Sequence, residues 1–213
     1  MNKVKLFLSL FVLFVGYSAS AQTNLFENPN FDQIAKDHHV IAIIPFSAKV
    51  KLRPKQMKEI TAEQLKEMEN SEGLSVQSAM YSWFLKRKKR GKLLIDVQDP
   101  KRTNALLHQK GITDTALLTP EQLAEILGVD AVISGTFETD KPMSDGASIA
   151  LGLLVGFWGA TNSATINMSV NNAGTGELLW NYNKRVSGSL GSSNDQLINT
   201  LMRKASRRLA YTK

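Results

Sequence analysis

The side chains that could carry out catalysis are few in this chain. It has no cysteine and three histidines, His38, His39 and His108, and no serine stands in a Gly-x-Ser-x-Gly turn. His38 and His39 are adjacent, so in an extended segment their rings point to opposite sides and cannot chelate one ion. The glycines that follow residue 151 lack the Lys-Ser/Thr that completes a phosphate-binding loop. These patterns predict no catalytic residue, no metal site and no cofactor.

Four carboxylates, Asp96, Asp99, Asp114 and Asp130, stand near the ends of predicted elements. Two carboxylates held close together can act as general acid and general base, but nothing in this spacing selects a pair. We therefore expect solvated loop acids and a protein that is not an enzyme. A hydrolase with an unrecognised serine or aspartate site is the alternative.

An uncharged apolar stretch, Ile149 to Ala160, interrupts the polar C-terminal half of the chain. It is too short for a membrane-spanning helix. It is either a loop that folds back over the core or an arm that contacts a partner or a membrane, since an apolar insertion left in water is a sticky patch. The candidate contact residues are Ile149, Leu151, Leu153, Leu154, Phe157 and Trp158.

A basic run closes a predicted helix, and the chain has a formal net charge of +7 at pH 7. Cations are favoured at the C-terminal end of a helix, where the partial charge of the backbone is negative. The run is therefore either a solvated helix end or a patch that binds an anionic surface. Its residues are Lys86, Arg87, Lys88, Lys89 and Arg90.

The first residues have the layout of a secretory signal peptide: Lys3 and Lys5, an apolar run, and Ala19-Ser20-Ala21. No cysteine follows the cut, so we expect no lipid anchor. We predict a signal peptide over 1–21, an N-terminal extension over 22–39 and a single α/β domain over 40–213. The expected location is the periplasm, with outer-membrane association as a further expectation, and this compartment disfavours nucleic acid as a partner.

The elements that would position these groups follow from apolar periodicity. Strands are predicted at 40–46, 93–97, 131–137 and 164–171, followed by a returning strand. Leu178, Trp180, Tyr182 and Val186 are predicted to share the buried face of that returning strand. Helices are predicted from Pro54, with Gly73 as an open question, at 103–110, at 119–128 and from Ser193. The order β-α-β-α-α-β-β-β-α predicts an α/β (α+β) fold, a single mixed sheet with helices packed on it.

Three segments carry a resemblance to a known family. They are Ala-Ile-Ile-Pro-Phe from Ala42, Leu-Gly-Val-Asp-Ala-Val-Ile-Ser-Gly from Leu127, and the hairpin that ends in Thr-Gly-Glu-Leu-Leu-Trp at Trp180. Together with the basic last helix, they resemble the envelope α/β domain of the curli-secretion channel protein, the TolB amino-terminal domain and the lipoprotein activators of penicillin-binding proteins. The resemblance implies a periplasmic, non-enzymatic domain that binds protein partners.

The expected function is that of an accessory or adaptor protein of the bacterial cell envelope. It would act through contacts with another envelope protein, with a homo-oligomer and a peripheral membrane contact as further expectations. One alternative is a subunit of an outer-membrane secretion or transport assembly resembling the curli channel. A second alternative is a regulator of a cell-wall enzyme.

Overall fold

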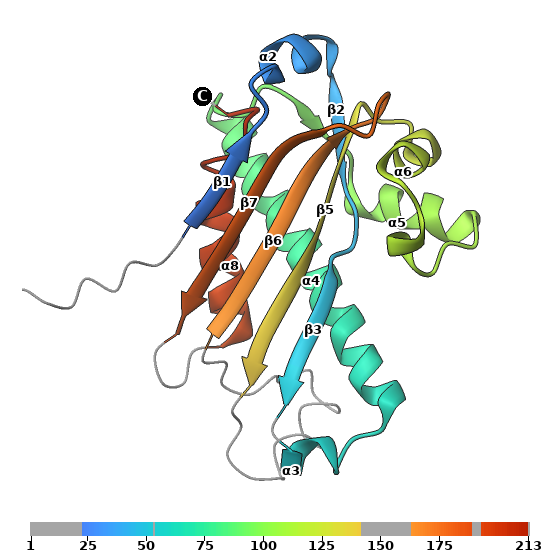
Figure 1. Ribbon diagram of the computed structural model, residues 1–213, viewed down its shortest axis with the longest axis vertical. Coiled ribbons are helices and arrows are strands. Elements are labelled where there is room, and N and C mark those ends of the chain that lie inside the picture. The colour runs from blue at the N-terminus through green and yellow to red at the C-terminus, as the bar shows by residue number, and fades with distance from the viewer. Residues whose placement is uncertain (1–22, 53, 142–162, 189–192, 213) are drawn as a thin grey trace, which may run out of the picture.

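One mixed seven-stranded sheet organises the chain (Figure 1). The computed structural model describes residues 23–52, 54–141, 163–188 and 193–212. The strand order is β1-β7-β6-β5-β2-β4, and β3 also pairs with β5. The strands are β1 (Thr23–Glu27), β2 (Val40–Ile43), β3 (Ser47–Leu52), β4 (Asp96–Val97), β5 (Ala131–Lys141), β6 (Ser163–Asn172) and β7 (Leu178–Ser187). The predicted fold class, a mixed sheet with helices packed on it, is confirmed.

Helices cover the two faces of the sheet unequally. The long helix α4 (Ala62–Lys89) and the last helix α8 (Asn194–Ala205) lie together on one face, while α5 (Pro100–Gln109) and α6 (Pro120–Leu127) pack on the other face beside β2 (Figure 1). The short helices are α2 (Phe31–Ile34) and α3 (Pro54–Met57), with 3-10 turns at Ala35–Asp37 and Thr115–Leu117. Within the described residues, no helix combines the length and the apolar character that crossing a membrane requires.

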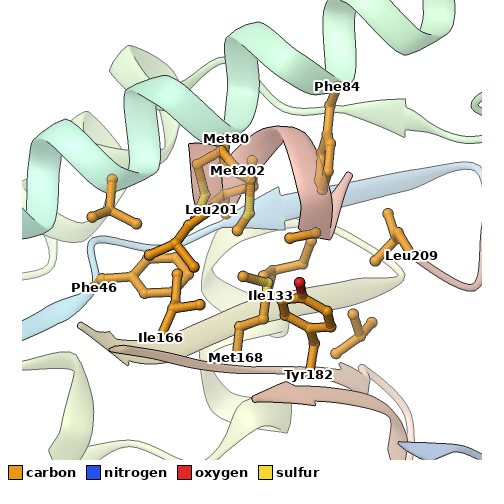
Figure 2. Close-up of a cluster of buried hydrophobic side chains, with 14 of the residues drawn as sticks. Phe46, Met80, Phe84, Ile133, Ile166, Met168, Tyr182, Leu201, Met202 and Leu209 are labelled. Carbon is orange, nitrogen blue, oxygen red and sulfur yellow. The ribbon is translucent and has the colours of Figure 1, made fainter. Parts of the chain in front are cut away.

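The main core lies between the sheet and the pair α4 and α8. Figure 2 shows Met80 and Phe84 from α4 and Leu201 and Met202 from α8 above Ile133 and other strand residues. A second core joins Ala42, Ile44 and Val132 to α5 and α6. Strand β2 is therefore buried on both faces, as its β-branched apolar run predicts.

The structure adds two strands to the predicted order. Strand β1 forms within residues 22–39 and pairs with β7, and most of its side chains are exposed. An exposed edge strand leaves no apolar pattern to detect. Strand β3 follows Pro45 and alternates buried Ala48 and Val50 with exposed neighbours, parallel to β5. The sequence interpretation predicted one strand over 40–46 and no strand after it, whereas β2 ends at Ile43 and β3 begins at Ser47.

The predicted buried face of the returning strand is wrong at Leu178. A β-bulge separates Val170 from Asn171 in the β6–β7 pairing. The extra residue shifts the alternation by one position. Leu178 is therefore 37% exposed, and the neighbouring Leu179 is fully buried in its place.

Helix α4 runs through Gly73 without a break. Thr61 and Gln64 form a capping box at its start. At Gly73 the helix touches the chain where β2 passes into β3, and the Phe46 N–H donates to the Gly73 carbonyl at 3.4 Å. A Cβ atom on Gly73 would lie 2.1 Å from the Phe46 carbonyl oxygen. The glycine is thus a contact point between helix and sheet.

Candidate functional site: the basic end of helices α4 and α8

Helices α4 and α8 finish at the same end of the molecule (Figure 1). The segments that follow them are joined, because Leu93 bridges to Thr212 and the Leu94 N–H donates to the Tyr211 carbonyl at 3.1 Å. The predicted basic run of α4 is thereby brought beside the basic residues at and just after the end of α8. We call this surface the basic end; it comprises Lys86, Arg87, Lys88, Lys89, Arg90, Lys92, Arg203, Lys204, Arg207 and Arg208.

Local sequence explains why the cations gather here. In α8 the apolar residues follow one stripe, which is buried against the sheet and α4, so the basic residues occupy the opposite face. Helix α4 ends at Lys89, and Gly91 takes the left-handed conformation, with φ of 64°, that allows the chain to turn away. Two helix C-termini, each with partial negative charge, then lie among the cations.

Like charges stay close together in this folded surface. Burial, followed by the neighbouring Arg207 and Arg90, lowers the pKa of Arg87. Lys184 on β7 is only 6% exposed and donates a hydrogen bond to the Thr23 hydroxyl. Its burial lowers the pKa of Lys184, and Lys204 and Arg208 lower it further. An anion bound here would offset this repulsion.

Contacts at the rim hold part of the surface in place. Lys86 lies over the Trp83 ring at 4.5 Å, and the Trp83 indole N–H donates to Asn199 of α8 at 3.3 Å. Lys88 forms an ion pair with Asp96. Lys89, Arg90, Arg203, Arg207 and Arg208 are also exposed. The basic end therefore offers several cations to a partner on a scaffold that is already ordered.

The four carboxylates singled out in the sequence have structural roles. Asp99 accepts from the Lys101 N–H at 2.7 Å at the start of α5, and Asp114 accepts from the Ala116 N–H at 2.9 Å. Asp96 pairs with Lys88. Asp130 accepts from the backbone N–H groups of His39 and Val40, at 2.7 and 2.8 Å. Asp130 thus ties the start of β2 to the start of β5.

Replacing Asp130 tests that tie. Burial raises the pKa of Asp130, but the hydrogen bonds from Val40 and His39 and the nearby histidines lower it, and the pKa ends below its ordinary value. The stabilisation is therefore complete above the unfolded pKa of about 3.9 and is lost as the pH falls through the lower folded pKa. We expect Asp130→Asn to cost about 1–2 kcal/mol near neutral pH, and to cost less in acid. Urea unfolding at both pH values checks this, and an equal loss at both would contradict it.

A groove of about 740 Å³ runs between α4, α5 and the β2–β3 junction. Asn104 lies in it and exchanges hydrogen bonds of 3.0 Å with the buried amide of Gln77. The sequence patterns did not indicate this groove, because its lining comes from separate segments. The lining combines Lys66, Glu69, His108 and Asp114 with apolar side chains, so it lacks the single charge sign of the basic end.

The other candidate contact, Ile149, Leu151, Leu153, Leu154, Phe157 and Trp158, lies outside the described residues and stays a prediction. The predicted signal peptide over 1–21 also lies outside them. The basic run 86–90 is described. The residues that the sequence interpretation did not assign to this patch are Lys92 and the cations at and just after the end of α8, Arg203, Lys204, Arg207 and Arg208. The spacing of these last four opposite the apolar stripe was visible, but their position beside α4 was not.

Comparisons with known proteins identify structural likenesses only. No protein family model matches the chain, and no curated protein matches its sequence. The chain is similar to the PelC dodecamer from Paraburkholderia phytofirmans (11% identity, TM-score 0.49, 88% of this chain and 98% of that chain). It is also similar to lipoprotein GNA1162 from Neisseria meningitidis (16% identity, TM-score 0.45, 81% of this chain and 98% of that chain). A further similar structure is the LpoB C-terminal domain from Salmonella enterica (12% identity, TM-score 0.37, 75% of this chain and 94% of that chain). The curli-secretion channel protein and the TolB domain stay predictions of resemblance.

Proposed function

We propose that this protein is a non-enzymatic accessory protein of the bacterial cell envelope that holds an anionic envelope component on its basic end. The observation that carries the proposal is the convergence of two basic segments, far apart in sequence, where α4 and α8 finish. Cations concentrated on one surface attract and orient anionic partners. The envelope location rests on the signal-peptide pattern and on the sequence resemblance.

A helix end that is merely solvated would need no second basic segment beside it. Here burial lowers the pKa of Arg87 and of Lys184, and the basic residues Arg207, Lys204 and Arg208 lower these pKa values further. Asp96 and the two helix C-termini offset part of this repulsion. An anion bound at the exposed cations would offset more of it, which supports a binding role for the surface.

The test compares two charge reversals of equal size. Arg90→Glu with Arg207→Glu changes the basic end, and Lys101→Glu with Arg102→Glu changes exposed cations at the start of α5. On immobilised heparin, used as a polyanion probe, we expect the first variant to elute at clearly lower salt than the second. Equal elution of both variants would show that only net charge matters and would contradict the proposal. Thermal unfolding of both variants controls for folding.

Contacts with an envelope protein remain part of the proposal. We propose residues 149–160 as the segment that makes that contact. A second copy of this chain, in a homo-oligomer, is a further proposed partner. Both rest on the apolar, uncharged composition of the segment. They act through a different part of the chain from the basic end, so either can fail without the other.

A further inference from the structure

An exposed leucine stands inside the basic end. Leu94 is 61% exposed, although its neighbours Leu93 and Ile95 are 5% and 2% exposed and belong to the core. Leu94 therefore points away from the core, in the connection that leaves α4. Single exposed apolar residues are common on proteins, so its meaning depends on what surrounds it.

The chain segments next to Leu94 carry basic residues. Its N–H donates to Tyr211, in the segment that directly follows Arg207 and Arg208. Lys92 lies two residues before it, and Asp96, two residues after it, is paired with Lys88. The leucine thus lies where the segments that follow the two basic helix ends are joined.

The last turns of α4 present further apolar surface. Leu85 is 44% exposed and precedes Lys86. Peripheral membrane surfaces combine Lys and Arg with bulky apolar side chains. A protein interface instead gathers its apolar residues at the centre and its charges at the rim. Leu85 and Leu94 are scattered near the basic residues rather than gathered at a centre, which fits the arrangement of a peripheral membrane surface.

We propose that the basic end docks on the phosphate-bearing surface of an anionic phospholipid bilayer, with Leu94 entering the headgroup layer. This inference rests on the proposed function and names its anionic partner. Lysines and arginines near an anionic bilayer each contribute on the order of a few-fold to tenfold in affinity. Leu94 adds an apolar contribution that a soluble polyanion does not provide.

The test is a co-sedimentation assay with the protein purified in the form that the cells produce. The vesicles consist of phosphatidylcholine, with or without the anionic lipid phosphatidylglycerol. We expect sedimentation only with the anionic vesicles. Leu94→Asp should weaken it about tenfold. Leu117→Asp is the matched control, because Leu117 is 82% exposed in the 3-10 turn before α6, away from the basic end. Arg90→Glu with Arg207→Glu should weaken binding on the order of 30-fold.

The outcomes separate the two proposals. Retention on heparin without binding to anionic vesicles would overturn the bilayer inference, indicate a soluble polyanion or an acidic protein as partner, and leave the proposed function standing. Equal vesicle binding by Leu94→Asp and Leu117→Asp would also overturn it. If the wild-type protein binds neither heparin nor anionic vesicles, the proposed function itself is overturned.

Discussion

Trp180→Ala is expected to cost about 3–5 kcal/mol of unfolding free energy, the range for removing a fully buried large aromatic side chain. Trp180 has no exposed surface and stacks on Tyr182, with ring centroids 5.6 Å apart and planes inclined by 2°. Its indole N–H donates to the Arg208 carbonyl at 2.8 Å. Truncation therefore removes core packing and the anchor of the chain after α8.

Urea unfolding measures the loss of stability, and the salt concentration at which the variant elutes from heparin measures the binding of polyanions by the basic end. Because Trp180 holds the backbone of Arg208, we expect the variant to elute at lower salt as well. Trp83→Ala is the matched control, since Trp83 is only half-buried and bonds Asn199. It should cost about 1 kcal/mol or less. Similar losses for the two tryptophans would contradict the assigned roles.

Gly73→Ala is expected to destabilise the protein by about 3 kcal/mol, in the range of overpacked core positions. In an exposed helix the same change would stabilise by about 1 kcal/mol, because alanine has the higher helix propensity. The sign reverses here because the added Cβ would lie 2.1 Å from the Phe46 carbonyl oxygen, a backbone atom that cannot rotate away. Helix α4 would have to move off the β2–β3 junction.

Thermal and urea unfolding of Gly73→Ala check the size and the sign. Ser75→Ala, at an exposed position two residues along α4, is the control and should raise stability by a few tenths of a kcal/mol. A stabilised Gly73→Ala variant would show that the helix does not approach Phe46 this closely. Gly73 lies in the first half of α4, and residues 86–90 lie at its far end. A shift of the helix at Gly73 is therefore also expected to displace the cations of residues 86–90.

Much of the fold was predictable where the signal is local. The helices predicted at 119–128 and from Ser193 both form, and each begins with a capping box, Thr119 with Gln122 and Ser193 with Gln196. The alternation of 164–171 places Ile166 and Met168 in the core. Leu178 was mispredicted because a bulge shifts the alternation, and a bulge is a property of two paired strands. The strand β1 was missed because its exposed residues carry no periodic signal.

Sequence alone determined the α/β class, the element order around α4 to α8 and the basic run at 86–90, because hydrophobic period, caps and charge are properties of neighbouring residues. Only the tertiary structure decided that α4 and α8 finish side by side, that Lys184 lies beside Lys204 and Arg208, and that Gly73 is a contact with Phe46. These are relations between segments distant in the chain. The apolar faces of the helices pack against one sheet, and this packing determines which segments, and therefore which charged residues, lie side by side.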